Sequence, residues 1–214
     1  MLERLALIDG LHLSRDDYLE DFWTVANSHG GLFWKFERKQ SFSEPDDASW
    51  RALARGDADE AVRLTEDAFP SRAEQMRSEP FDKAQRVRVV GEPFSKYLRW
   101  ELLVLNQWAD LGEDIRVLPS DVIGPLETAR PLPEVTVIAG HVAYEVLYND
   151  AAELSGARKF VDMAIVDGCT KDIERFWLRA QDLKTFLAER PDAILTRNSG
   201  GESPEAVRQH EKSA

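Results

Sequence analysis

Residues 86–119 constrain the fold of this chain most, because they predict a strand, a helix and a second strand in immediate succession. Residues 86–90 alternate and are rich in valine, which is typical of a strand. Ser95 is a good N-cap for a helix that begins at the next residue, and Gly112 is placed to end that helix. Residues 115–118 are the second strand. A helix between two strands favours parallel pairing with a right-handed crossover.

The predicted helix carries one unusual side chain, Glu101, on its apolar side. At about 100° per residue, Glu101 lies between Tyr97 and Leu105 and next to Trp108. An isolated buried charge is very costly, so we expect this carboxylate to be neutralised, hydrogen-bonded or paired. Three arginines of the flanking strands could each supply a bidentate partner: Arg86, Arg88 and Arg116.

Two hypotheses for Glu101 compete. In the first, which we favour, it forms a structural ion pair that fixes the helix against the sheet. In the second, it recognises a ligand or acts as an acid or base in a pocket lined by Tyr97 and Trp108. Perturbed carboxylates cluster at functional sites, but structural networks also perturb pKa values. A pocket that reaches Glu101 would favour the second hypothesis, and a packed interior with Glu101 closed onto an arginine would favour the first.

The stretch before this unit predicts a strand and a helical insert. Residues 33–42 alternate with one aromatic and one charged face, which is typical of a sheet edge or a half-covered sheet. We expect Glu37 and Arg38 to form cross-strand charge pairs. Residues 43–80 predict a small helical insert whose first short helix is capped by Ser49.

The stretch after this unit predicts a hairpin and a last helix. Residues 134–138 and 142–148 are two strands around a tight turn, with His141 in the turn and no second histidine near it in the sequence. Thr170 is expected to cap a helix that runs through Leu187. Cys169 would then lie at a helix start, where the thiol pKa can be lowered. We favour the alternative that this cysteine is buried or incidental.

These elements predict an α/β protein with one domain over residues 1–192. Its mixed β-sheet has a central parallel strand–helix–strand unit, and helices pack on the sheet. Residues 193–214 are polar and contain glycine and proline, so we expect a mobile tail.

Charge and composition limit the partners. A net charge of -12 opposes direct nucleic-acid binding and binding to anionic membranes. No apolar run approaches the roughly 20 residues of a membrane span. The N-terminus is too charged for a signal peptide, so we expect a cytoplasmic location. A single cysteine excludes an internal disulfide.

The strong catalytic and cofactor motifs are absent from the sequence. It contains no G-x-G-x-x-G, no Walker A loop, no G-x-S-x-G and no H-E-x-x-H. The four histidines are scattered, and none pairs at metal-ligand spacing. We therefore predict no cofactor and no metal, and we identify no catalytic residue.

Several words of the sequence resemble an uncharacterised actinobacterial, Streptomyces-type domain family over about residues 30–190. They are WKFERKQ (34–40), SWRALARGD (49–57), RVRVV (86–90) with Pro93, YLRWEL (97–102), GEDIRVL (112–118), LPEVTV (132–137) and YEVLY (144–148). Members are often encoded beside helix-turn-helix regulators, so the resemblance implies a role in regulation or specialised metabolism.

The strand–helix–strand unit followed by a hairpin also resembles half of a phospholipase-D-like sensor fold. The H-x-K-x₄-D motif of that superfamily is missing, because no lysine stands two residues after His141. If that fold is present, its phosphodiester chemistry is lost.

We expect a non-enzymatic accessory protein that binds a small molecule or a partner regulator, for example a helix-turn-helix protein; a homodimer is compatible with this role. The predicted ligand-binding residues are Glu101, Tyr97, Trp108, Arg88 and Arg116, with Glu37 and Arg38 as outer members. The alternative is an enzyme of specialised metabolism that uses Glu101 as acid or base and an arginine as anion clamp.

Overall fold

The strand–helix–strand unit forms as predicted. The computed structural model describes residues 1–197, and in it β3 (Lys83–Val90) pairs in parallel with β4 (Asp114–Pro119), with α5 (Lys96–Leu111) connecting them. Ser95 Oγ accepts a hydrogen bond from the backbone N–H of Leu98 at 3.0 Å. Gly112 ends the helix at a φ of 112°, a left-handed conformation that glycine adopts without strain. Both predicted caps are therefore confirmed.

The described residues form one mixed eight-stranded sheet, in the order β1-β7-β6-β5-β2-β3-β4-β8. Strands β2, β3 and β4 are parallel, and the other neighbours are antiparallel. The predicted α/β class and the predicted hairpin of β5 and β6 are confirmed. The remaining strands are β1 (Leu11–Ser14), β2 (Leu32–Glu37), β5 (Glu134–Ile138), β6 (Val142–Tyr148), β7 (Leu154–Phe160) and β8 (Gln181–Asp182).

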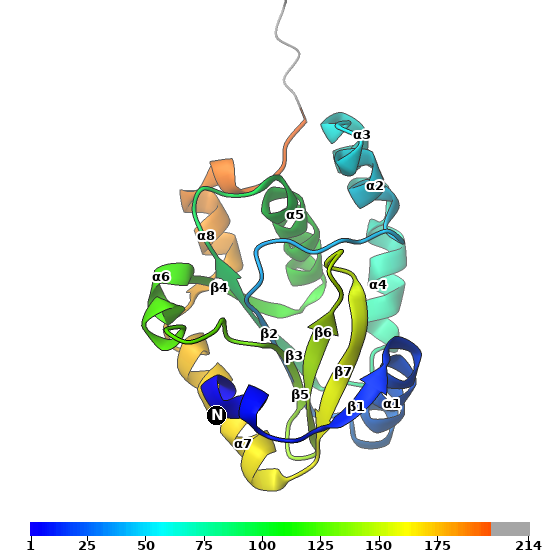
Figure 1. Ribbon diagram of the computed structural model, residues 1–214. Helices are drawn as coiled ribbons and strands as arrows, with labels where there is room; N and C mark the ends of the chain where they lie inside the picture. Colours follow the sequence, from blue (N-terminus) through cyan, green and yellow to red (C-terminus); the bar gives the residue numbers. More distant parts are fainter. Residues whose placement is uncertain (198–214) are drawn as a thin grey trace, which may run out of the picture.

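Helices cover both faces of the sheet (Figure 1). One face packs α7 and the N-terminal turn η1 on buried side chains such as Trp34, Phe36 and Val135. The opposite face packs α1 against β5, β6 and β7, and α5 against β3 and β4. The helices and turns are η1 (Leu2–Leu7), α1 (Arg15–His29), α2 (Ala48–Ala54), α3 (Ala58–Asp67), α4 (Phe69–Ser78), α6 (Ser120–Ile123), η2 (Gly124–Leu126), α7 (Met163–Trp177), α8 (Leu183–Glu189) and η3 (Pro191–Ala193).

The pattern of residues 33–42 predicted a sheet edge or a half-covered sheet. The first alternative is wrong, because β2 is an interior strand between β5 and β3. Its aromatic face packs in the core with α7, and its charged face, which includes Lys35 and Glu37, lies on the side covered by α1. Charged residues can occupy an interior strand here because other charges of the same face pair with them. This charged face becomes part of the site described below.

The predicted insert contains α2, α3 and α4, but Ser49 is not its first cap. Asp47 Oδ1 accepts hydrogen bonds from the backbone N–H groups of Ser49 at 2.7 Å and Trp50 at 3.0 Å. The buried hydroxyl of Ser49 instead accepts a hydrogen bond from the indole N–H of Trp100 at 2.9 Å. Ser49 therefore links the insert to α5 by a hydrogen bond and does not cap α2.

The prediction that Thr170 begins the last helix is wrong. Helix α7 begins at Met163 after the cap Asp162, and the Thr170 hydroxyl donates to the carbonyl of Val166 at 3.0 Å. The helix continues through this point because its buried side chains pack on the sheet. Cys169 is one of them, and burial raises the pKa of its thiol to about 12, so the buried-cysteine alternative is supported. Strand β8 and helix α8 follow as separate elements.

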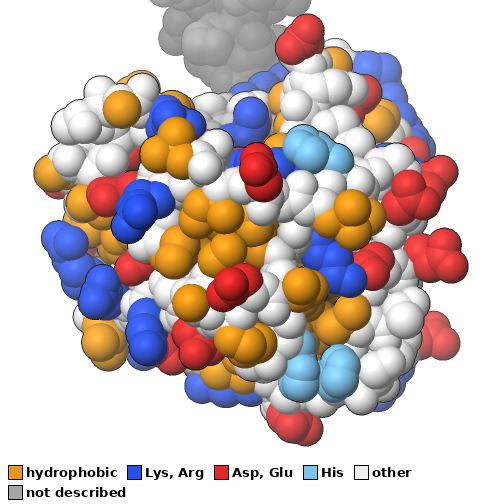
Figure 2. Space-filling model, turned by 60° about the horizontal axis from the view of Figure 1, so that its bottom comes forward, with side chains coloured by type: hydrophobic (Ala, Val, Ile, Leu, Met, Phe, Trp, Pro, Cys, Tyr) orange, Lys and Arg blue, Asp and Glu red, His pale blue; other side chains and the backbone are white. Residues whose placement is uncertain are grey.

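The first residues of the predicted tail are in contact with the domain. Ala193 is buried, and the backbone N–H of Leu195 donates to the carbonyl of Arg99 at 2.8 Å. The rest of the predicted tail, residues 198–214, lies outside the described residues. Within residues 1–197, none of the helices combines the length and the apolar character that crossing a membrane requires. Figure 2 shows acidic, basic and apolar side chains interspersed over one face of the molecule.

Candidate functional site

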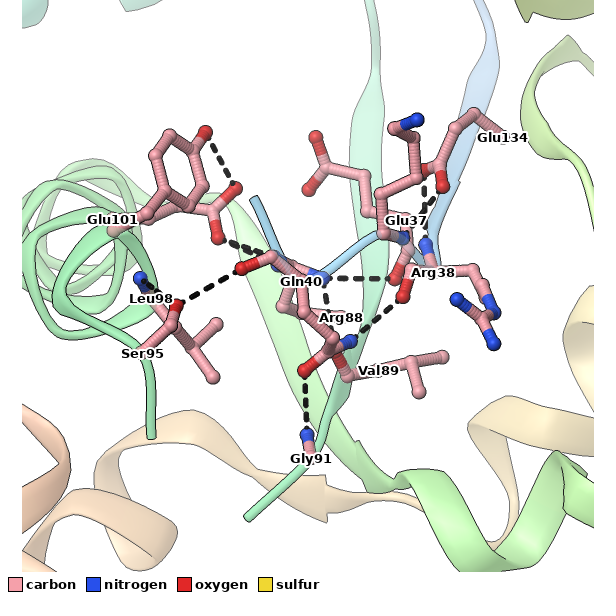
Figure 3. A network of polar contacts seen from close by, with 12 residues as sticks. Glu37, Arg38, Gln40, Arg88, Val89, Gly91, Ser95, Leu98, Glu101 and Glu134 are labelled. Atoms are coloured by element: carbon pink, nitrogen blue, oxygen red, sulfur yellow. Dashed lines mark hydrogen bonds and ion pairs between the residues drawn. The ribbon is translucent and has the colours of Figure 1, made fainter. Parts of the chain in front are cut away.

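Arg88 is the arginine that Glu101 meets. Its Nε donates to Glu101 Oε2 at 2.7 Å, and its Nη2 lies 2.6 Å from the same oxygen, out of line for a hydrogen bond. Arg88 has no exposed surface, and its Nη1 donates to the carbonyl of Val89 at 2.9 Å. The Tyr97 hydroxyl donates to the other Glu101 oxygen at 3.3 Å. Burial raises the pKa of Glu101, while the Arg88 guanidinium opposes that rise. Glu101 is thus closed between α5 and the sheet (Figure 3).

A second cluster of charges surrounds Glu37 on the neighbouring strand. Glu37 lies 2.7 Å from Lys35 Nζ and 2.9 Å from Arg86 Nη1, and Arg86 Nε also donates to Glu113 at 2.7 Å. Burial by itself would raise the pKa of Glu37, but Arg86, Lys35 and Arg88 together lower it far below its ordinary value. Glu37 is therefore an ionised carboxylate, and its predicted cross-strand pair is present.

Three of the predicted site residues lie elsewhere. The Arg116 guanidinium stacks 4.3 Å from the ring centroid of Trp177, on the face of the sheet that α7 covers. Arg38 forms a bidentate pair with Glu127, at 2.7 Å for both contacts, and not with a neighbouring strand. Trp108 packs against the cluster formed by α5 and α8. The structure therefore brings together Glu101, Tyr97, Arg88 and Glu37 and separates the other three.

A cavity of about 570 Å³ opens on the same face of the sheet, beside this network and beneath α1. Aromatic rings of α1, β2, β6 and the segment between α4 and β3 line it, together with charged side chains. The cavity lining includes Glu37 but not Glu101, Tyr97 or Trp108. The rings are Tyr18, Phe22, Trp23, Phe33, Phe81 and Tyr148. Phe36 also borders the cavity, but its ring stacks on Phe176 at the opposite face of the sheet.

Among the acidic residues of the cavity, Glu37 alone was identified from the sequence; two of those that were missed, Glu134 and Glu44, have strongly raised pKa values. Glu134 opens β5, is 5 % exposed and accepts backbone N–H groups of Arg38 at 2.9 Å and Lys39 at 2.6 Å. Glu44 is half-buried and accepts a long hydrogen bond from the Tyr97 hydroxyl at 3.4 Å. Burial raises the pKa of each to about 7. The sequence could have indicated Glu134, because an acidic residue at the start of the valine-rich stretch 134–138 is unusual. It offers no comparable signal for Glu44, which lies in a polar turn.

The hairpin turn also brings two histidines together. His29, at the end of α1, stacks on His141 with ring centroids 3.9 Å apart. A second histidine therefore lies beside His141 in space although none is near it in the sequence. Within residues 1–197, no group of three or more His, Cys, Asp or Glu side chains is arranged to hold a metal ion.

The fold and the site define an α/β domain with an aromatic and acidic cavity on one face of its sheet. Residues 20–188 match the family model of a domain of unknown function, DUF6879, and the chain belongs to this family. A comparison with curated proteins gives no match. Among solved structures, the chain is similar to a phospholipase D family member, Nuc from Salmonella typhimurium. That likeness has 13 % identity, covers 74 % of this chain and 86 % of that chain, and has a TM-score of 0.41.

Proposed function

We propose that this DUF6879 protein binds a small molecule in the cavity beneath α1 and serves as a non-enzymatic accessory protein. The observation that carries the proposal is the cavity itself. Its volume of about 570 Å³ lies within the range of roughly 300–1,000 Å³ that small-molecule sites occupy, and its lining combines aromatic rings with charged side chains.

Binding is better supported than catalysis through Glu101. The cavity does not reach this carboxylate, which is closed onto Arg88. An anion clamp would need an arginine with a free guanidinium edge. Arg86 is taken by Glu37 and Glu113, and Arg116 stacks on Trp177. We therefore propose that Glu101 is structural, and that the enzyme of specialised metabolism is the weaker alternative.

Regulation or specialised metabolism is the setting we propose for this binding. The support is the resemblance of the chain to a Streptomyces-type family whose members are often encoded beside helix-turn-helix regulators. In this proposal the ligand-loaded protein, as a monomer or homodimer in the cytoplasm, changes its affinity for such a regulator. The net charge of -12 suits a protein partner with basic surface better than direct contact with nucleic acid.

Native mass spectrometry of the protein purified from its own host tests the proposal. The wild type should carry a stoichiometric small-molecule adduct. Ser43→Trp should lose that adduct, because Ser43 lines the cavity and a tryptophan there occupies it. Ser71→Trp is the matched control, since Ser71 is exposed on α4 and is not part of the lining.

Circular dichroism must show that all three proteins are folded. A bare wild-type mass would refute the proposal for the cavity. A bare mass that co-purifies with a helix-turn-helix protein would place the function on the surface instead.

A further inference from the structure

The cavity contains more carboxylates than bases, and its bases are already paired. Six acidic and three basic side chains line it. Lys35 and Arg86 both contact Glu37, at 2.7 and 2.9 Å, and Arg86 also contacts Glu113. The third base, Arg15, lies 3.5 Å from Asp46 at the exposed rim. No lining cation is therefore left free to hold an anionic ligand.

Four lining carboxylates have no such partner. They are Glu44, Glu79, Glu134 and Glu153. Among residues 1–197, no basic side chain lies within 4 Å of any of these four carboxylates. Glu134 is 95 % removed from solvent, and each of its oxygens receives one backbone N–H and keeps a lone pair for a further donor. Glu44 receives one long hydrogen bond from Tyr97 at 3.4 Å. Lys35 and Arg88 act on Glu44 and Glu134, respectively, only from beyond contact distance and do not offset the effect of burial, which raises the pKa of each carboxyl group. A cation bound in contact with them removes the cost of burying their charge.

The walls of the cavity also suit a cation. The rings of Phe33 and Phe81 stack with centroids 4.7 Å apart, and Phe22 meets Phe33 edge to face at 5.7 Å. Aromatic faces attract ammonium and guanidinium groups and also bury apolar surface. Tyr148 already interacts with one cation, because Lys39 Nζ lies 5.4 Å from its ring centroid.

From these contacts we infer that the cavity takes an organic cation, an amine or amidine attached to an aromatic or apolar body. The charged group meets Glu134 and Glu44, and the body lies against the rings of α1 and β2. This inference rests on the proposed function, since it names the chemical class of the ligand for the same cavity. An anionic ligand of the same shape would have to displace Glu37 from both Lys35 and Arg86.

Isothermal titration of the full chain at pH 8 with three matched probes tests the inference. The probes are 2-phenylethylamine, which is cationic, 2-phenylethanol, which is neutral, and 3-phenylpropionate, which is anionic. The amine should bind at least ~10-fold more tightly than the alcohol, which corresponds to about 1.4 kcal/mol. The acid should bind more weakly than both.

Two variants assign the preference to residues. Glu44→Gln and Glu134→Gln should each weaken amine binding by ~10-fold more than they weaken alcohol binding. Glu74→Gln, an exposed acid of α4 outside the cavity, is the control and should change neither. Glu134 also accepts two backbone N–H groups, so its substitution perturbs the backbone as well. If Glu134→Gln does not fold, Glu44→Gln decides.

The outcomes separate this inference from the proposed function. The inference of a cationic ligand is overturned if the alcohol or the acid binds as tightly as the amine. It is also overturned if Glu44→Gln binds the amine as tightly as the wild type. In both cases the cavity remains a binding site. When none of the probes binds, the adduct in the native spectra decides. A basic compound supports the inference, a neutral or acidic compound overturns it, and a bare mass overturns both proposals.

Discussion

Replacing Glu101 by glutamine should destabilise the protein strongly, because Arg88 would remain buried without its counter-charge. Arg88 is fully buried and Glu101 is 6 % exposed. Removing one partner of such a pair typically costs about 3–5 kcal/mol, several times more than the roughly 0.5 kcal/mol of a surface change. Glutamine keeps the shape of the side chain and retains an oxygen for Tyr97, so the loss reports the missing charge.

Urea unfolding followed by circular dichroism measures this loss as a shift in midpoint at constant slope. In a domain of this size about 3–5 kcal/mol also lowers Tm by roughly 6–20 °C. A control is the double variant Glu101→Leu with Arg88→Met, which removes both charges. It should be less destabilised than the sum of its single variants, because no unpaired charge remains. A loss below about 0.5 kcal/mol for Glu101→Gln would refute the buried pair.

Three further predictions follow from other contacts. Ser95→Ala should lower the free energy of unfolding by about 1 kcal/mol, since it removes the N-cap of α5; an unchanged urea midpoint would contradict this. Glu44 has a pKa of about 7 in the folded protein against 4.5 ordinarily, so the native state holds extra protons between these values and wild-type stability falls as pH rises through that window. Glu44→Gln cannot titrate and should therefore gain stability relative to wild type, on the order of 1 kcal/mol, between pH 5 and pH 8 in urea titrations. Cys169 is buried with a raised pKa, so a thiol reagent such as dithionitrobenzoate should react only after denaturant is added, and rapid reaction in native buffer would show an accessible thiol.

Helix α5 is the element that the sequence determined most fully. Its capping serine, its terminal glycine and its apolar stripe all act within a few residues of each other, so the local sequence is sufficient to place both ends. The same periodicity put Glu101 on the apolar side and required a partner for it. Three arginines satisfied that requirement equally well in the sequence.

Only the tertiary structure chose among those arginines. Parallel pairing places Arg88 opposite Glu37 and Arg86 opposite Lys35, while Arg116 points to the other face of the sheet. A shift of one residue reverses the face on which a strand side chain lies. The partner of a strand arginine therefore depends on face and register, which local patterns do not fix.

Long-range packing also decided where local signals misled. Thr170 is a good cap by type, yet α7 passes through it because Val166, Cys169 and Ile173 together bury one stripe on the sheet. The cavity is the strongest case, because its lining comes from α1, β2, the turn at residues 43–46, and strands β3, β5 and β6. The sequence determined that this chain forms an α/β domain with a carboxylate in need of a partner. The position of the cavity and the surplus of acid inside it arose only when segments more than 100 residues apart were brought together on one sheet face.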